Sequence, residues 1–285
     1  MRRLALLALL PLAACSKAPT GAAPHQIHIA GSSAGYLLST QVAERLMRED
    51  PDVLAPLVRA GGTGEGIARF CDKDNPTRPD ILITTRKMTA EEQARCAADG
   101  STDIEQKWIG DTTVMAVKAK DGSPPPFGDT ADLVKALTSN AKTWAEVRSG
   151  LPAKPIVIHG PTPTPAIADT LYGPILKDDR PVRTDGAYTG HGADADMVAR
   201  IVADKPGAIG IMPYPQALTH HDTLTIVALS NVKAFPLFLV SRPRDVSHVL
   251  GLSRLLGYYG DALSHERDDI FPEPPKPIKT ADAKL

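Results

Sequence analysis

Short apolar runs alternate with amphipathic stretches along most of the chain, and glycine and proline separate them. The runs typical of β-strands are 26–30, 80–84, 113–118, 155–159, 208–212, 223–228 and 236–240. The stretches with helical periodicity are 37–48, 66–71, 90–98, 144–148, 166–171, 196–203 and 246–263. Alternation of this kind predicts an α/β fold with mostly parallel sheets, in which ligands sit at the carboxyl ends of the strands.

Length and helix starts add to this expectation. The chain has 285 residues and is 42% hydrophobic, which is enough for a large core and suits two lobes. Two of the helical stretches begin with a capping box, Thr89 with Glu92 and Thr143 with Glu146.

The N-terminus has the pattern of an export signal. Arg2 and Arg3 precede a short apolar stretch, and small residues lead to Cys15. The stretch before Cys15 looks like the lipobox of bacterial lipoproteins, which implies a signal peptide at 1–14 and a lipid on Cys15. An ordinary signal peptide with an accidental cysteine is the alternative. Residues 15–24 then read as a flexible tether to a membrane, and we expect a periplasmic or cell-surface location.

Cys71 and Cys96 remain once Cys15 is assigned to a lipid. An even number of cysteines in an oxidising compartment favours one disulfide between them. Two buried free thiols are the alternative.

The charge of the mature chain argues against a nucleic-acid partner. Loss of Arg2 and Arg3 lowers the 32 basic residues to 30, against 33 acidic ones, which gives a net charge of −3. Binding to nucleic acid would need a basic face. The proline-rich segment 272–285 reads as a surface strap or a disordered tail.

Three turns after predicted strands are rich in Gly, Ser and Thr. Their candidate ligand-binding residues are Ser32, Ser33, Gly62, Thr63, Gly64, Thr84, Thr85 and Arg86. Because helix N-termini present free N–H groups and a positive dipole end, such turns favour an anion. Glu65 would oppose an anion unless it points outward. No Gly-Lys-Ser/Thr follows the glycines, so a P-loop is excluded and no cofactor is expected.

Residues 31–35 also match the nucleophile elbow of serine hydrolases. This alternative would use Ser33 as nucleophile, Asp185 as the acid, and His191 or His220 as base. Neighbouring residues 220–222 could be read as metal ligands, but adjacent side chains in a loop rarely converge on one ion, so no metal is expected.

Taken together and in order, several segments resemble the substrate-binding proteins of phosphate ABC transporters (PstS-like), within the type 2 periplasmic binding protein superfamily. The segments that carry the resemblance are 29–33, 62–66, 79–88, 185–188 and 205–211. Cys71 and Cys96 also fall where one branch of that family has a cysteine pair.

The resemblance implies a two-lobed α/β fold that closes on a ligand without performing chemistry on it. Lobe 1 would span 25–112 and 234–271, and lobe 2 would span 113–233. The implied partners are inorganic phosphate or another small ligand and the membrane permease of an ABC transporter. An alternative use of the same fold is a surface interaction protein with no small ligand.

One segment departs from the family. Its Ser-Gly-Thr and Arg, which bind phosphate, correspond here to residues 165–168, which read Pro-Ala-Ile-Ala. Arg86 or Lys87, together with Thr162 and Thr164, could compensate and keep an oxyanion site. Alternatively, a more apolar cleft would take a less charged organic or lipid-like ligand, lined by Tyr36, Pro163, Pro165 and Ile167.

Overall fold

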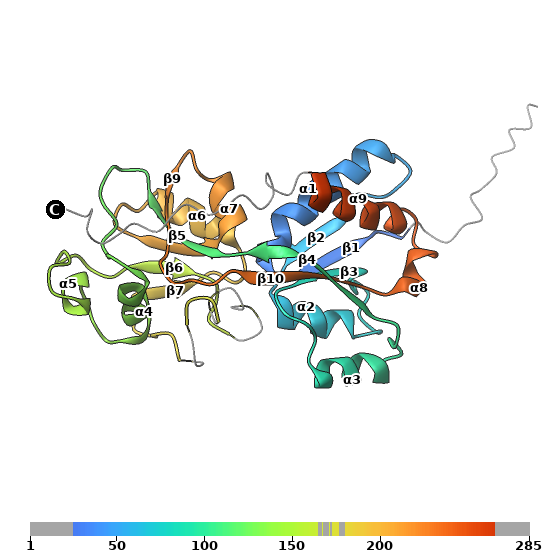
Figure 1. The fold of residues 1–285 in the computed structure, drawn as a ribbon, viewed down its shortest axis with the longest axis horizontal. Helices are drawn as coiled ribbons and strands as arrows, with labels where there is room; N and C mark the ends of the chain where they lie inside the picture. The colour runs from blue at the N-terminus through green and yellow to red at the C-terminus, as the bar shows by residue number, and fades with distance from the viewer. Residues whose placement is uncertain (1–24, 165–166, 168–170, 172, 177–179, 266–285) are drawn as a thin grey trace, which may run out of the picture.

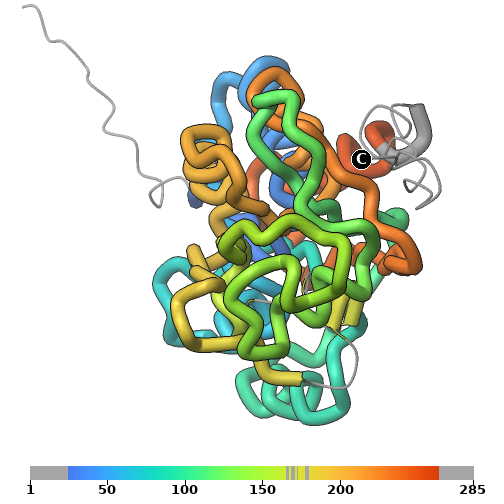
Figure 2. Tube along the Cα trace, turned by 90° about the vertical axis from the view of Figure 1, so that its left-hand side faces the viewer, coloured from blue at the N-terminus to red at the C-terminus, as the bar shows by residue number. Residues whose placement is uncertain are grey.

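The computed structural model describes residues 25–164, 167, 171, 173–176 and 180–265. They form two lobes that lie side by side (Figure 1). Viewed from the side of the second lobe, its green to yellow segments lie in front of the first lobe (Figure 2). The predicted signal peptide 1–14, the tether 15–24 with Cys15 and the tail 272–285 lie outside the described residues.

The first lobe is built on a five-stranded sheet of order β2-β1-β3-β10-β4. Its strands are β1 (His28–Gly31), β2 (Leu57–Ala60), β3 (Ile81–Thr84), β4 (Glu105–Thr112) and β10 (Phe235–Ser241). Its helices are η1 (Ser33–Gly35), α1 (Tyr36–Glu49), α2 (Thr63–Phe70), α3 (Ala90–Ala98), α8 (Pro243–Val246) and α9 (Leu252–His265).

The second lobe has a five-stranded sheet of order β7-β6-β8-β5-β9. Its strands are β5 (Val114–Ala119), β6 (Ile158–Gly160), β7 (Tyr188–Gly190), β8 (Ile209–Pro213) and β9 (Leu224–Val227). Its helices are α4 (Thr130–Thr138), α5 (Trp144–Val147), α6 (Ala195–Ala203) and α7 (Tyr214–Thr219).

Helices cover both faces of each sheet, which explains why the central strands are apolar throughout. In β3, Ile81 and Ile83 pack with α1 and α9, whereas Leu82 packs with α2 and α3 on the other face. In β5, Val114 packs with α4 and α5, whereas Met115 packs with α6 and α7. Successive side chains of a strand point to opposite faces, so one strand serves two cores.

The chain crosses between the lobes twice, from β4 to β5 and from β9 to β10 (Figure 1). The returning strand β10 runs antiparallel to β3 and β4, and β5 runs antiparallel to β8 and β9. The prediction of an α/β fold in two lobes is therefore confirmed, but "mostly parallel" is wrong. Both sheets are mixed, because each accepts a strand from a crossing segment.

Two local predictions are also wrong. The stretch 246–263 is not one helix, because α8 ends at Val246 and α9 starts at Leu252, with Gly251 between them at φ +81°. Thr143 caps no backbone N–H of α5, since its hydroxyl donates to the Glu146 carboxylate instead (3.0 Å). The capping box of Thr89 and Glu92 is present at the start of α3.

A disulfide joins Cys71 to Cys96, as the cysteine count predicted. It links the end of α2 to α3, with the two Cα atoms 4.4 Å apart. Both cysteines lie in a small core with Phe70, Leu82 and Val240. In the part of the chain that the structure describes, no helix has the length and apolar character needed to cross a membrane.

Candidate functional site

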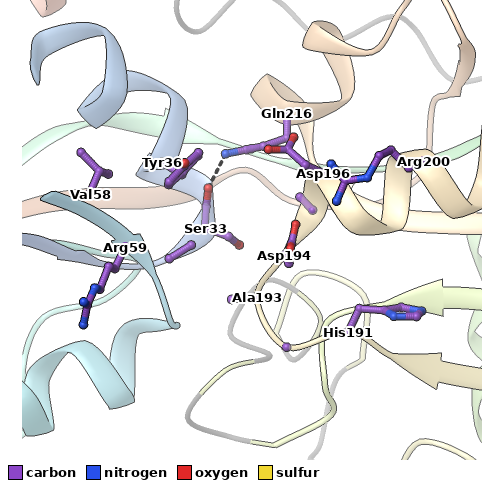
Figure 3. Close-up of a pocket in the computed structure, with 13 residues that line it drawn as sticks. Ser33, Tyr36, Val58, Arg59, His191, Ala193, Asp194, Asp196, Arg200 and Gln216 are labelled. Atoms are coloured by element: carbon purple, nitrogen blue, oxygen red, sulfur yellow. Dashed lines mark hydrogen bonds between the residues drawn. The ribbon is translucent and has the colours of Figure 1, made fainter. Parts of the chain in front are cut away.

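A cavity of about 450 Å³ lies between the two lobes (Figure 3). The first lobe contributes Ser33, Tyr36, Val58, Arg59 and Ala60, and the second contributes His191, Gly192, Ala193, Asp194, Ala195, Asp196, Arg200 and Gln216. These residues surround the start of η1 and α1 on one side and of α6 on the other. The N-terminal ends of helices present N–H groups and a positive dipole end, so this arrangement suits an anion.

The first predicted turn reaches this cavity because Gly31 allows a tight bend. Gly31 has φ +124°, and a Cβ on it would lie 2.0 Å from the Ile83 carbonyl oxygen, so only glycine fits. The next amide, of Ser32, donates to the same carbonyl (2.8 Å), and the Ser32 side chain caps η1. Ser32 is thus buried within the turn, while Ser33 lines the cavity.

A hydrogen bond between the lobes lies beside Ser33. The Nε2 of Gln216, on α7, donates to the Ser33 carbonyl oxygen (Figure 3). Gln216 is only 3% exposed, and its Oε1 is buried without a hydrogen-bond partner. The described conformation therefore holds the two lobes in contact at the edge of the cavity.

The second and third predicted turns join each other rather than line the cavity. The hydroxyls of Thr63 and Thr85 lie 3.0 Å apart, and the Thr85 amide donates to the Thr63 hydroxyl (3.0 Å). Gly62 takes φ +90° as the N-cap of α2, and Gly64 lies in the first turn of that helix. The ligand role of these residues stays a prediction.

Arg86 and Thr84 are also engaged within the first lobe. Arg86 makes a bidentate ion pair with Glu92 (2.7 and 2.8 Å), which holds the pKa of that carboxyl below its ordinary value. The Thr84 hydroxyl donates to the Arg86 carbonyl oxygen (2.9 Å). For Arg86 to replace the family's missing Arg in an oxyanion site, its ion pair with Glu92 would have to break. This role of Arg86 stays a prediction.

Thr162 supports the wall of the cavity from behind. Its amide donates to the Gly192 carbonyl and its hydroxyl accepts from the Gly192 amide, both at 2.8 Å. Thr164 follows, exposed, with its amide bonded to the Thr162 carbonyl (2.7 Å). Pro165, which was predicted to line an apolar cleft, lies outside the described residues.

Arg59 and Arg200 are the cationic side chains of the cavity, and the sequence prediction missed both. They come from opposite walls, Arg59 from β2 and Arg200 from α6 (Figure 3). Among the described residues, neither makes an ion pair or a side-chain hydrogen bond. The acidic residues of the cavity have partners of their own, since Asp194 accepts from the Met197 amide (2.8 Å) and Asp196 from His220 Nε2 (2.8 Å). Two arginines that form no ion pair among the described residues therefore remain for a ligand.

The side chains required for a serine hydrolase are not brought together. Asp185 binds Arg183 and Lys142 (both 2.7 Å), which holds the pKa of its carboxyl far below its ordinary value. His220 binds Asp196, and the ring of His191 lies against His159. In the described part of the chain, no histidine reaches the Ser33 hydroxyl. No group of three metal-ligating side chains is found there either.

His159 and His191 form a pair that the sequence did not predict. His159 Nδ1 lies 2.9 Å from His191 Nε2. Burial and the neighbouring charges of His191 and Lys205 lower the pKa of His159, and burial and Lys205 lower the pKa of His191. Protonation of both imidazoles is therefore less favourable than in a solvent-exposed histidine.

Acid is expected to destabilise the chain through this pair. Below pH about 6.5 the unfolded chain takes up protons that the folded pair resists, so the free energy of unfolding falls as the pH falls from 7.5 to 5. Urea unfolding in a phosphate-free buffer measures this change. The double variant His159→Gln/His191→Gln should lose less stability over the same range, and an equal loss would contradict the assignment.

The sequence pattern of the PBP superfamily domain matches residues 17–247, which is most of the chain. The chain belongs to this family. The match confirms the resemblance to type 2 periplasmic binding proteins, and the two lobes with a cavity between them are the structure expected of such a member.

Individual relatives of this binding-protein domain agree with the assignment. The phosphate-binding protein PstS of Bacillus subtilis (strain 168) is 27% identical over 208 residues, which are 72% of this chain but only 62% of that protein. A Clostridium perfringens protein whose crystal structure holds bound phosphate has a TM-score of 0.62 at 15% identity, covering 86% of this chain and 96% of its own. An ABC-type phosphate transport receptor from Vibrio cholerae has a TM-score of 0.53 at 13% identity, and the match covers 86% of this chain and 96% of that receptor chain. At these identities the two structures show the shared fold.

Proposed function

We propose that the chain is an extracytoplasmic solute-binding protein that binds phosphate or a related oxyanion between its lobes and delivers it to an ABC transporter permease. The observation that carries this function is the pair of arginines in the cavity, one from each lobe, neither of which forms an ion pair among the described residues. An anion between Arg59 and Arg200 would neutralise both and favour closure of the lobes. The matched Bacillus subtilis protein is named a phosphate-binding protein, which supports the same ligand class for this chain.

The other candidate residues take supporting roles in this proposal. Ser33 lies beside the cavity and offers a hydroxyl together with the start of η1. Thr162 holds the Gly192 wall, and the hydrogen-bonded pair of Thr63 and Thr85 fixes the neighbouring turns. The lipid on Cys15 would confine the binding protein near its permease and raise its effective concentration there.

A thermal shift tests the ligand class. At a phosphate concentration 100 times the Kd, binding to the folded chain adds about 2.7 kcal/mol to its stability, which raises the Tm by several degrees. Sodium chloride at equal ionic strength is the control and should give no such rise. If neither millimolar phosphate, sulfate nor a phosphate monoester raises the Tm, the proposed ligand class is wrong.

One observation favours an organic ligand as a second candidate. The cavity of about 450 Å³ falls within the range typical of organic ligand sites, and Tyr36 and Val58 add apolar surface to it. A phosphate monoester that raises the Tm more than inorganic phosphate at equal concentration would support this candidate.

A further inference from the structure

Two histidines form a hydrogen-bonded pair behind the second-lobe wall of the cavity. His159 lies in β6 and His191 directly follows β7, the parallel neighbour of β6. Their Nδ1 and Nε2 atoms are 2.9 Å apart, and their ring centroids are 5.2 Å apart. His191 lines the cavity, and its ring turns away from Ser33 and Gln216 (Figure 3). The pair thus lies next to the cavity without filling it.

This bond limits the pair to one additional proton. In the neutral pair, one ring nitrogen donates the single N–H between the two rings and the other accepts it. One more proton turns this into a stronger, charge-assisted hydrogen bond. A second additional proton would place two N–H groups face to face and break the hydrogen bond between the rings. His159 is 5% exposed, and its other nitrogen, Nε2, is buried without a partner, so solvent does not stabilise a charge on that side.

The charged groups around the pair are Lys205 and Asp194. Lys205 opposes a positive charge on both rings, while Asp194, the N-cap of α6, favours one on His191. Tyr188 on β7 donates its hydroxyl to the Pro161 carbonyl. Among the described groups, the carboxylate of Asp194 is therefore the one negative charge that acts on the pair, and an anion in the cavity would add another.

We propose that the His159–His191 pair takes up one proton when an oxyanion enters the cavity, so that the second lobe gains a positive charge upon occupation. This inference rests on the proposed function. A negative charge in the cavity that His191 lines favours the imidazolium form, and we expect it to raise the pKa of the pair by about one unit. By linkage, the anion binds about tenfold more tightly once the pair is charged.

Nitrogen NMR of the histidine rings tests this directly. A pH titration from 8 to 5 is recorded on the folded chain without ligand and with saturating phosphate. The apparent pKa of the pair should rise by about one unit with phosphate. The ring resonances of the exposed His248, outside the cavity on the first lobe, serve as the control and should be the same with and without phosphate. Sulfate, whose charge is constant over this range, serves as a second ligand.

A variant extends the test to affinity. In wild type, sulfate should bind several-fold and at most about tenfold more tightly at pH 5.5 than at pH 8. His191→Gln should remove most of that difference, whereas His248→Gln should keep it. If phosphate binds but no histidine pKa changes, the inference is wrong and the proposed function stands. If no oxyanion perturbs any resonance or binds at any pH, the proposed function itself fails.

Discussion

The substitution Arg200→Gln is expected to weaken oxyanion binding about 10- to 100-fold. Arg200 extends from α6 into the cavity, and no described acidic group neutralises it. A hydrogen bond from a charged donor to an anion contributes about 1.5–3 kcal/mol, which corresponds to this loss of affinity. Glutamine keeps the length of the side chain and much of its packing but removes the charge. Calorimetric titration with phosphate measures the change in Kd.

Three further variants separate charge from geometry. Arg200→Lys keeps the charge but loses the planar guanidinium, so an intermediate affinity is expected. Arg59→Gln removes the cation of the opposite lobe and should also weaken binding. Arg95→Gln changes an exposed arginine of α3 outside the cavity and should bind as wild type does. Wild-type affinity in the double variant Arg59→Gln/Arg200→Gln would contradict the assigned site.

Removal of the disulfide is expected to lower the free energy of unfolding by about 3 kcal/mol. The bridge closes a loop over a sequence separation of 25 residues, and a cross-link of that length restricts the unfolded chain by about this amount. Cys71→Ala/Cys96→Ala is the suitable variant, because both positions are buried among apolar side chains and alanine leaves no buried hydroxyl. Urea unfolding at neutral pH measures the difference.

Reduction of the wild-type protein is the matched control for that variant. A reductant should lower the urea midpoint of wild type toward that of the double variant and leave the variant unchanged. Equal midpoints for wild type and variant under oxidising conditions would show that the bridge contributes no stability.

Most of the strands that the sequence predicted are buried on both faces, and the edge strand β9 is the exception. The continuous apolar run of β3 and the run of β5 were recognisable because two cores require apolar residues at every position. The short edge strands β2 and β7 were missed, since half-buried edges tolerate residues such as Arg59 and Thr189. The strand β4 was missed because it is mostly polar on its exposed side.

Local turn chemistry made one wall of the site predictable. The run of Gly31, Ser32 and Ser33 marked a turn after a strand, and the structure places Ser33 at the cavity. Gln216 could not be found this way, because its bond to Ser33 joins residues 183 positions apart across the lobes. The pairing of His159 with His191 depends likewise on the parallel register of β6 and β7. Contacts of this kind follow from tertiary packing, which local periodicity does not encode.

A crystal structure of the protein grown with phosphate tests the central claim most directly. The proposed function predicts one tetrahedral anion per chain between the lobes, within hydrogen-bond distance of Arg200 and beside Ser33 and Arg59. It also predicts that the anion is absent from crystals of Arg59→Gln/Arg200→Gln grown under the same conditions. An empty cavity at millimolar phosphate, or an anion bound only elsewhere on the molecule, would contradict it.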